Sequence, residues 1–136
     1  PHTWKAGPKV VYYLALLNKN DAAHARAKAL SGKLVSPVLT TAWVLTEVGD
    51  AFRVPPQRQA FLNLVEDLQA DPEVRILPAT EDIFQRGIAF YQRRPDKEWP
   101  LTDCISFVAM QEYAILDALT GDRHFEQAGF IALLKS

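Results

Sequence analysis

The alternation of short apolar runs with longer amphipathic stretches is the feature that most constrains the fold of this chain. Strand-like runs are predicted at Lys9–Val11, Leu34–Leu39, Val74–Leu77, Ile115–Leu119 and Phe130–Leu134. Stretches with helical spacing separate them, at Ala22–Leu30, Ala42–Phe52, Gln57–Ala70, Glu81–Arg93, Leu101–Glu112 and, as a turn with a short helix, Thr120–Ala128. Strands that alternate with helices form a parallel sheet covered on both faces. We therefore predict an α/β fold in three layers, with a central parallel sheet of four to five short strands flanked by helices.

Residues that commonly begin and end helices support these boundaries. Asp21, Thr41 and Thr80 each directly precede a predicted helix. Their side-chain oxygens can accept hydrogen bonds from the free N–H groups of a first helical turn. Gly32 follows the alanine-rich helix, where a left-handed conformation often ends a helix. These signals favour separate helices between the strands.

Length and composition indicate one domain of ordinary size. The chain has 136 residues, of which 49% are hydrophobic and 23% are charged, a balance typical of globular proteins. We expect residues 9–136 to form this domain and residues 1–8, which show no periodicity, to be a disordered leader or the remnant of an added segment.

The single cysteine and the apolar runs bear on location. Cys104 has no second thiol with which to form an internal disulfide, so the fold needs no oxidising compartment. No apolar run approaches the roughly 18 residues of a membrane span. We expect a cytoplasmic protein without membrane association, in which Cys104 is packed rather than reactive.

Three carboxylates lie in apolar settings near strand ends and helix starts, and a parallel α/β sheet forms its sites beyond the carboxyl ends of its strands. Glu47 lies in the second turn of the helix that follows the second predicted strand, among apolar neighbours. Asp103 lies one turn into its own helix, and Asp122 follows the fourth predicted strand. Carboxylates avoid apolar surroundings unless they are paired or bound to a cation. Together these positions predict a cation site.

Each of these acids also has an ordinary structural interpretation. Asp103 suits the positive start of a helix, and Thr102 beside it could cap that helix. Glu47 taken alone fits a solvated helix residue, and Asp122 taken alone fits a turn. Only the joint placement of the three acids favours a shared site.

Several stretches of the sequence resemble the PIN domain family, and in particular its VapC-like toxin ribonucleases. These stretches are Thr40-Thr41 with Glu47, Trp99–Phe107, Ala118–Phe125 and Ala128–Phe130, and their order and spacing agree with the family. The early run Tyr12–Asn18, followed by Asp21 and His24, resembles the opening of the family. The resemblance covers the chain from Lys9 onward and implies a ribonuclease-like fold.

The resemblance also implies a pocket of four acids that holds Mg²⁺ or Mn²⁺. Glu47, Asp103 and Asp122 would be three of these acids, acting as catalytic residues and as metal ligands. Thr120 would be a hydroxyl that supports the site. Asp96 would be an auxiliary acid, although its charged loop also fits simple solvation. Carboxylate oxygens suit such hard cations, and the bound metal would activate water for hydrolysis of RNA.

The first acid of the family pattern is absent from this sequence. PIN domains carry an aspartate at the end of the first strand, whereas Val10-Val11 here runs directly into Tyr12-Tyr13. The predicted strand Lys9–Val11 is short, and the helix expected after it has no capping residue. We therefore hypothesise that a few residues, including an aspartate, are missing between Val11 and Tyr12.

A formal net charge of −1 gives the chain no general attraction to nucleic acid, so RNA binding would need a local basic rim. Residues on loops and helix ends near the predicted acids are weak candidates for phosphate contacts, and a solvated surface is the alternative for each: Arg123, Lys97, Arg93, Arg94 and Lys19. His124 is expected to form a structural hydrogen bond, with a phosphate contact as the alternative.

Three functions from different classes fit these observations. The first is a metal-dependent endoribonuclease, the toxin of a type II toxin–antitoxin pair, which forms a homodimer and binds an antitoxin protein. The second is a non-catalytic PIN scaffold that binds RNA or protein because its pocket lacks an acid. The third is a small α/β binding domain whose acids are structural. Metal-dependent cleavage of RNA separates the first from the other two.

Overall fold

Five short parallel strands form one sheet in the computed structural model, which describes residues 12–14 and 37–133. The strands are β1 (Tyr12–Leu14), β2 (Val38–Thr41), β3 (Val74–Leu77), β4 (Asp117–Leu119) and β5 (Ile131–Ala132). Their order across the sheet is β3-β2-β1-β4-β5, and every neighbouring pair is parallel. The predicted parallel α/β fold is confirmed, and β1 is its central strand.

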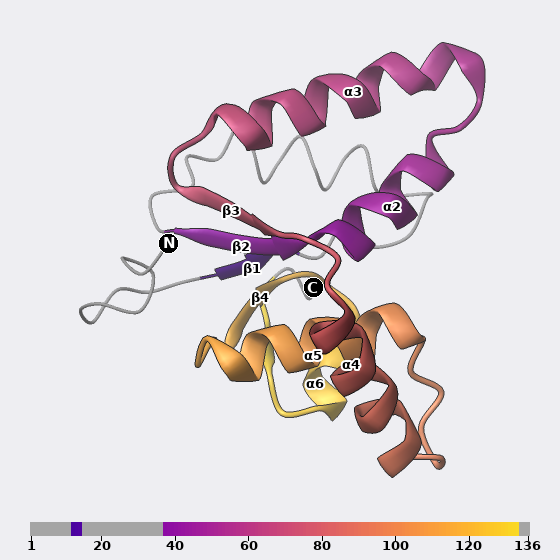
Figure 1. The fold of residues 1–136 in the computed structure, drawn as a ribbon, viewed down its shortest axis with the longest axis vertical. Coiled ribbons are helices and arrows are strands. Elements are labelled where there is room, and N and C mark those ends of the chain that lie inside the picture. Colours follow the sequence, from indigo (N-terminus) through magenta and orange to yellow (C-terminus); the bar gives the residue numbers. More distant parts are fainter. Residues whose placement is uncertain (1–11, 15–36, 134–136) are drawn as a thin grey trace.

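Two groups of helices cover opposite faces of this sheet (Figure 1). The helices are α2 (Ala42–Ala51), α3 (Pro55–Ala70), α4 (Glu81–Arg93), α5 (Leu101–Glu112) and α6 (Arg123–Gln127). In Figure 1, α2 and α3 lie above the strands, and α4, α5 and α6 lie below them. In the described part of the chain, no helix combines the length and the apolar character needed to cross a membrane.

Adjacent residues of β2 show why the sheet has two apolar faces. Val38 and Leu39 point in opposite directions because side chains alternate along a strand. Val38 packs in a cluster with side chains of α2, of its C-cap residue and of α3, namely Leu45, Val48, Phe52, Leu64 and Leu68. Leu39 packs in a second cluster that includes Phe90 of α4, Phe107 of α5 and Phe125 of α6. One cluster lies on each face of the sheet, so the sheet and the two groups of helices form the predicted three layers.

Threonine hydroxyl groups cap the starts of two helices. The Thr41 hydroxyl oxygen accepts a hydrogen bond from the backbone N–H of Val44 at 3.2 Å, and α2 begins at the next residue. The Thr80 hydroxyl accepts in the same way from the N–H of Ile83 at 3.3 Å. Both caps agree with the sequence prediction. The helix α5 is different, because its N-cap residue is Pro100 and Thr102 lies inside the helix.

The structure corrects the prediction for Tyr12–Leu14. Tyr12–Leu14 was expected to open a helix, but these residues form β1 and pair with both β2 and β4. A short apolar run fits a buried strand as well as a helix, and pairing on both edges decides for the strand. The expected leader, the expected strand Lys9–Val11, the helix Ala22–Leu30 and the Val11–Tyr12 junction lie outside the described residues.

Smaller corrections concern the ends of other strands. The second strand was predicted to end at Leu39, but β2 continues through Thr40 and Thr41, whose side chains are fully buried. The fourth was predicted to begin at Ile115, but β4 begins at Asp117. Ala114 has a φ of 55°, a left-handed turn that separates α5 from this strand. The pairing partners, rather than apolar character, therefore set the strand ends.

Candidate active site

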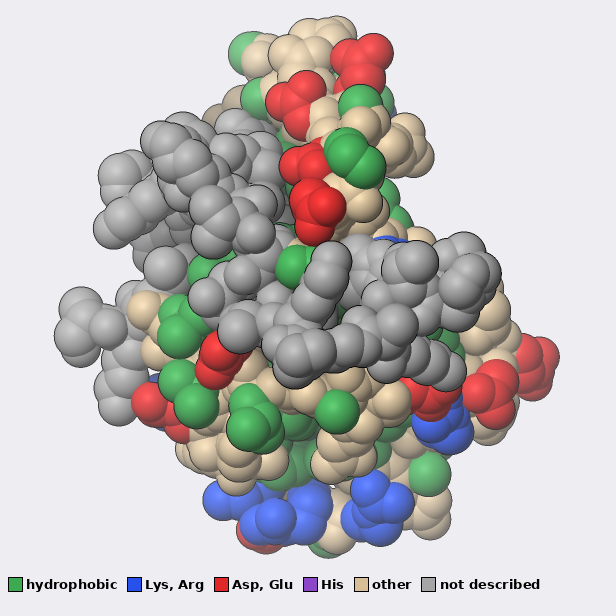
Figure 2. Space-filling view, turned by 90° about the vertical axis from the view of Figure 1, so that its left-hand side faces the viewer, with side chains coloured by type: hydrophobic (Ala, Val, Ile, Leu, Met, Phe, Trp, Pro, Cys, Tyr) green, Lys and Arg blue, Asp and Glu red, His purple; other side chains and the backbone are tan. Residues whose placement is uncertain are grey.

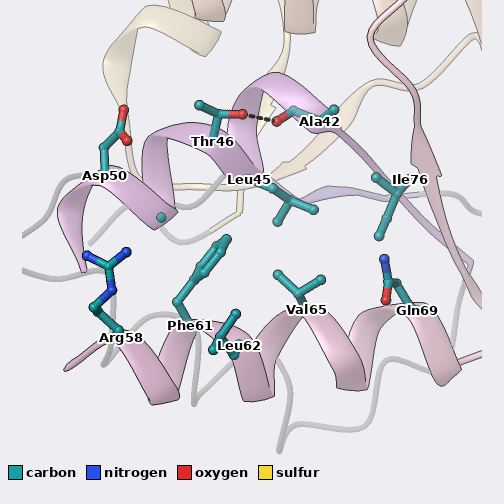
Figure 3. A pocket seen from close by; sticks show the side chains of 11 residues that line it. Ala42, Leu45, Thr46, Asp50, Arg58, Phe61, Leu62, Val65, Gln69 and Ile76 are labelled. Atoms are coloured by element: carbon teal, nitrogen blue, oxygen red, sulfur yellow. Dashed lines mark hydrogen bonds between the residues drawn. The ribbon is translucent and has the colours of Figure 1, made fainter. Parts of the chain in front are cut away.

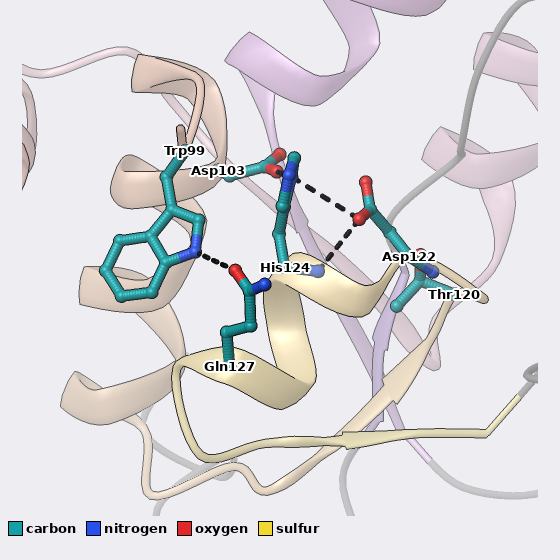
Figure 4. Close-up of polar contacts among 6 residues, drawn as sticks. All are labelled: Trp99, Asp103, Thr120, Asp122, His124 and Gln127. Atoms are coloured by element: carbon teal, nitrogen blue, oxygen red, sulfur yellow. Dashed lines mark hydrogen bonds and ion pairs between the residues drawn. The ribbon is translucent and has the colours of Figure 1, made fainter. Parts of the chain in front are cut away.

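Asp103, Asp122 and His124 come together at the carboxyl end of the sheet. Asp103 lies in the first turn of α5, Asp122 is the N-cap residue of α6, and His124 lies in the first turn of α6. One potential ligand atom from each residue lies within 4.8 Å of the other two. Figure 4 shows the two carboxylates on either side of the imidazole ring. Two of the three predicted acids are therefore neighbours.

The imidazole of His124 connects the two aspartates. Its Nδ1 atom lies 3.1 Å from Oδ2 of Asp103 and 3.4 Å from Oδ1 of Asp122. The side chains are largely enclosed, with exposed fractions of 20% for His124 and 15% for Asp103. The structural hydrogen bond expected for His124 is present, although the sequence did not indicate its partners.

The turn between β4 and α6 fixes the position of Asp122. The hydroxyl oxygen of Thr120 accepts a hydrogen bond from the backbone N–H of Asp122 at 3.1 Å. The Asp122 carboxylate in turn accepts from the backbone N–H of His124 at 2.9 Å and so caps α6. Thr120 is fully buried. The hydroxyl that the resemblance proposed as a support for the site thus supports the turn that carries Asp122.

Burial and neighbouring charge disfavour ionisation of Asp103. Burial is the largest influence, and together with the charges of Asp122 and Glu47 it raises the pKa of Asp103 to about 6 despite the hydrogen bond from His124. A carboxylate that is both buried and repelled by neighbouring carboxylates is stabilised by a cation. This electrostatic situation is the one expected of a metal-binding carboxylate before the metal binds.

Glu47 of α2 approaches the same site from the opposite helix layer. Its charge acts on Asp103, although Glu47 itself is exposed as a residue. Partial burial of its carboxyl group raises the pKa of Glu47, a hydrogen bond with Thr102 lowers it, and the charge of Asp50 raises it. Thr102 was interpreted as a possible helix cap, but it instead contacts Glu47. The sequence spacing gave no signal for this contact.

The residues present fit a divalent cation. Asp103 and Asp122 offer carboxylate oxygens, and Glu47 brings a third carboxylate into electrostatic contact with them. Hard oxygen donors of this kind suit Mg²⁺ and Mn²⁺. His124 adds one nitrogen atom to the group. The donor set is therefore consistent with the predicted metal, while the identity of the ion stays a prediction.

Asp96 has a different partner. Its carboxylate accepts two hydrogen bonds from the Arg94 guanidinium, each at 2.9 Å. This pairing lowers the pKa of Asp96 to about 2. Asp96 is exposed and is not part of the Asp103–Asp122–His124 group. The contacts of Asp96 therefore favour the alternative of a solvated loop residue over an auxiliary acid.

The basic residues proposed for RNA contact are mostly exposed and partly engaged elsewhere. The guanidinium of Arg94 lies 5.5 Å from the Trp99 ring, and that of Arg93 lies 4.9 Å from the Phe90 ring. Arg123 is exposed, Lys97 is half-buried, and Lys19 lies outside the described residues. Figure 2 shows Lys and Arg side chains together at the lower end of the molecule. Acidic side chains lie at the upper end and also beside some of the basic ones. Their role in RNA binding remains a proposal.

Cys104 and Trp99 belong to the core beside the site. Cys104 is fully buried, and burial raises the pKa of its thiol to about 11. It is therefore packed, as predicted, and is a poor nucleophile at neutral pH. Trp99 is buried, and its indole N–H donates a hydrogen bond to Gln127 of α6 at 2.9 Å.

The central strand ends beside the acids without contributing one. Leu14, the last residue of β1, is in register with Leu119 of β4, one residue before Thr120. The described residues of β1 are Tyr12, Tyr13 and Leu14. The family's first aspartate was expected at the end of the first strand, so this end of β1 has no acidic counterpart in the described residues.

A separate cavity lies between α2 and α3 (Figure 3). Its volume is about 610 Å³, and apolar side chains such as Leu45, Phe61 and Val65 line it. Asp50 and Arg58 lie at one end of it. None of Glu47, Asp103 and Asp122 lines this cavity, so it is distinct from the acidic site.

Comparison with known proteins gives a family and a fold. The PIN domain family profile matches residues 10–131. Four solved chains match the structure, one of which is Mycobacterium tuberculosis VapC20, described as a sarcin-ricin loop cleaving toxin. That protein is 24% identical, with a TM-score of 0.75 over 90% of this chain and 98% of its own. No curated protein matches this chain significantly.

Proposed function

This chain belongs to the PIN domain family, and from that membership and its acidic site we propose that it is a divalent-metal-dependent endoribonuclease. The observation that carries the proposal is the close approach of Asp103 and Asp122 at the carboxyl end of a parallel sheet. Such an end is where parallel α/β proteins bind substrates. The raised pKa of Asp103 adds an electrostatic reason for a cation there.

The chain's own residues would bind the metal and orient the substrate. We propose Asp103 and Asp122 as direct metal ligands and Glu47 as the third acid, acting from the side of α2. Thr120 would hold the turn of Asp122 through its hydrogen bond to the backbone N–H. A bound Mg²⁺ or Mn²⁺ supplies an activated water and stabilises charge on the phosphate during hydrolysis of the phosphodiester bond. Asp96 is left out of this proposed site because Arg94 holds it.

The proposed biological role is that of a toxin in a type II toxin–antitoxin pair. The similarity of fold to VapC20, described as a sarcin-ricin loop cleaving toxin, supports this role. The role includes an antitoxin protein as partner, a homodimer as the assembled state, and activity in the cytoplasm. Light scattering of the purified protein at tens of micromolar tests the assembly, and a mass equal to one chain would count against the homodimer.

One observation favours a second candidate, a PIN scaffold that binds RNA or protein without cleaving it. The end of β1 has no acid among its described residues, next to the turn that carries Asp122. A site with fewer carboxylates binds a divalent cation less tightly. Metal binding and RNA binding without strand cleavage would identify the scaffold.

The test is cleavage of two labelled RNAs, one that contains a sarcin-ricin loop and one of unrelated sequence. Each is incubated with the protein in Mn²⁺, in Mg²⁺, and in EDTA. The nuclease proposal requires cleavage that depends on the metal and disappears in EDTA. Cleavage that is unchanged in EDTA would point to a contaminating metal-independent nuclease. Intact RNA under every condition would contradict the nuclease proposal and leave the non-catalytic scaffold as the remaining candidate.

A further inference from the structure

His124 offers two N–H groups to carboxylates that come from different helices. Its backbone N–H donates to Oδ1 of Asp122 at 2.9 Å. Its Nδ1 atom lies 3.1 Å from Oδ2 of Asp103 in α5 and 3.4 Å from Oδ1 of Asp122 (Figure 4). Ionised carboxylates only accept hydrogen bonds, so when both acids are ionised this arrangement requires a hydrogen on Nδ1. One residue therefore connects both acids.

The backbone of His124 is held in place by its neighbours on both sides. Asp122 caps α6 in front of it, and Phe125 directly after it is 2% exposed. The Phe125 ring packs edge-on against Phe107 of α5, with ring centroids 5.0 Å apart. Because Phe107 is one helical turn after Asp103, this packing fixes α6 against the part of α5 that carries Asp103. The imidazole is thus presented from a rigid position.

We propose that His124 is a positioning residue that holds Asp103 and Asp122 together in the arrangement that binds the divalent cation. The inference rests on the proposed metal-dependent function. Two neighbouring carboxylates repel each other in the absence of a cation. An N–H group between them offsets that repulsion and holds one oxygen of each carboxylate near Nδ1. Residues that orient metal ligands in this way commonly change metal affinity by about 10- to 100-fold when they are replaced.

A direct ligand role for His124 predicts different behaviour. The Nδ1 atom belongs to the group of atoms close enough to surround one ion. A nitrogen ligand would favour Mn²⁺ over Mg²⁺, because Mg²⁺ prefers oxygen. Loss of such a ligand would therefore weaken Mn²⁺ binding more than Mg²⁺ binding. Loss of a positioning residue weakens the binding of both ions by the same factor.

Three variants separate these roles. His124→Ala removes the ring, whereas His124→Asn keeps an N–H donor at about the distance from the backbone at which histidine carries Nδ1. Gln127→Ala is the matched control on the same helix, because it removes the hydrogen bond from Trp99 and touches neither acid. The dissociation constants of Mn²⁺ and Mg²⁺ are measured by calorimetry on the full chain, with melting temperatures recorded alongside.

We expect His124→Ala to weaken binding of both ions about 10- to 100-fold, and His124→Asn to recover most of that loss. Gln127→Ala should lower the melting temperature while leaving both dissociation constants unchanged. The proposal is overturned if His124→Asn binds metal as poorly as His124→Ala, or if His124→Ala weakens only the binding of Mn²⁺. It is also overturned if Gln127→Ala weakens binding as much as His124→Ala.

A second measurement decides the proposal without a metal. Nitrogen–proton NMR of the metal-free protein shows which ring nitrogen of His124 carries hydrogen. We expect a hydrogen on Nδ1 at neutral pH, and a ring protonated only on Nε2 would overturn the inference. If the parent protein binds neither ion, the metal-dependent function itself fails. A hydrogen on Nδ1 in that case would show that the contact exists but serves no metal site.

Discussion

The ring of Phe107 in α5 lies 5.0 Å from the ring of Phe125 in α6, at an interplanar angle of 85°. This edge-to-face contact joins the two helices that carry the candidate acids. Phe107 also contacts the rings of Phe90, Trp99 and Phe130, with centroids 5.2 to 5.7 Å away. The aromatic cluster therefore connects α4, α5 and α6 beneath the site.

Replacement of Phe107 by alanine should strongly destabilise the protein. Phe107 is fully buried at the centre of this cluster, so its removal leaves a cavity that the neighbouring rings cannot close. We expect the free energy of unfolding to fall by about 3–5 kcal/mol, measured by urea denaturation. Tyr91→Ala is the control, because Tyr91 is 54% exposed and should change stability by no more than about 0.5 kcal/mol. Equal effects of the two variants would contradict this role of the cluster.

The stability of the metal-free protein should depend on the ionisation of Asp103. Burial raises its pKa from 3.8 to about 6, so between these values the folded state keeps a proton that the unfolded state has lost. The contribution of Asp103 to the free energy of unfolding therefore falls as the pH rises through this window. The change is at most about 3 kcal/mol for a shift of this size.

Urea unfolding in EDTA between about pH 4 and pH 6 measures this dependence. Asp103→Asn cannot ionise, so its stability should vary less steeply over the same range. Asp82→Asn is a suitable control, since Asp82 is exposed and pairs with Arg86 on the surface of α4. Parallel pH profiles for the parent and Asp103→Asn would rule out a raised pKa for Asp103.

Addition of Mn²⁺ should stabilise the folded protein. A cation that binds only the folded state adds about 2.7 kcal/mol at a concentration one hundred times its dissociation constant. We expect the melting temperature to rise with Mn²⁺ and to return to its original value in excess EDTA. Asp103→Asn and Asp122→Asn should each abolish most of this rise. A monovalent salt at the same ionic strength is the control, and an equal rise with that salt would exclude a specific site.

Local signals explain which helices and strands the sequence predicted well. The predicted bounds Val74–Leu77 and Glu81–Arg93 agree with β3 and α4. Thr80 caps α4, and apolar residues at helical spacing define its inner face, so both signals lie within the segment itself. Tyr12–Leu14 lacks such signals. Its assignment to a strand depends on pairing with β2 and β4, which lie far along the chain.

The same distinction holds for the candidate site. The rule that sites form beyond the carboxyl ends of parallel strands pointed to Asp122, and the apolar setting of a helix start pointed to Asp103. The contact of His124 with Asp103 spans 21 residues and depends on how α6 packs against α5. The contact of Thr102 with Glu47 depends on how α5 meets α2. Sequence spacing cannot show either contact, because neither lies within one element.

Replacement of either aspartate by asparagine should abolish the proposed cleavage of RNA while leaving the fold intact. Asparagine has almost the same shape as aspartate but lacks the charge that binds a divalent cation. Asp103→Asn should also unfold at higher urea concentration than the metal-free parent at neutral pH, because it removes a buried charge that its neighbours repel. Cleavage is measured with the labelled RNAs and Mn²⁺, and circular dichroism checks the fold.

Asp82→Asn is again the matched control, since it removes one exposed carboxylate that pairs with Arg86. We expect it to cleave RNA at the parental rate. If Asp103→Asn or Asp122→Asn cleaved RNA at that rate, the catalytic role proposed for that residue would be wrong. If both variants were inactive but still bound Mn²⁺ as tightly as the parent, the two aspartates would act in the reaction without being metal ligands. Loss of both cleavage and Mn²⁺ binding is the outcome that the proposed site requires, because in that site the same carboxylates hold the ion that activates the water.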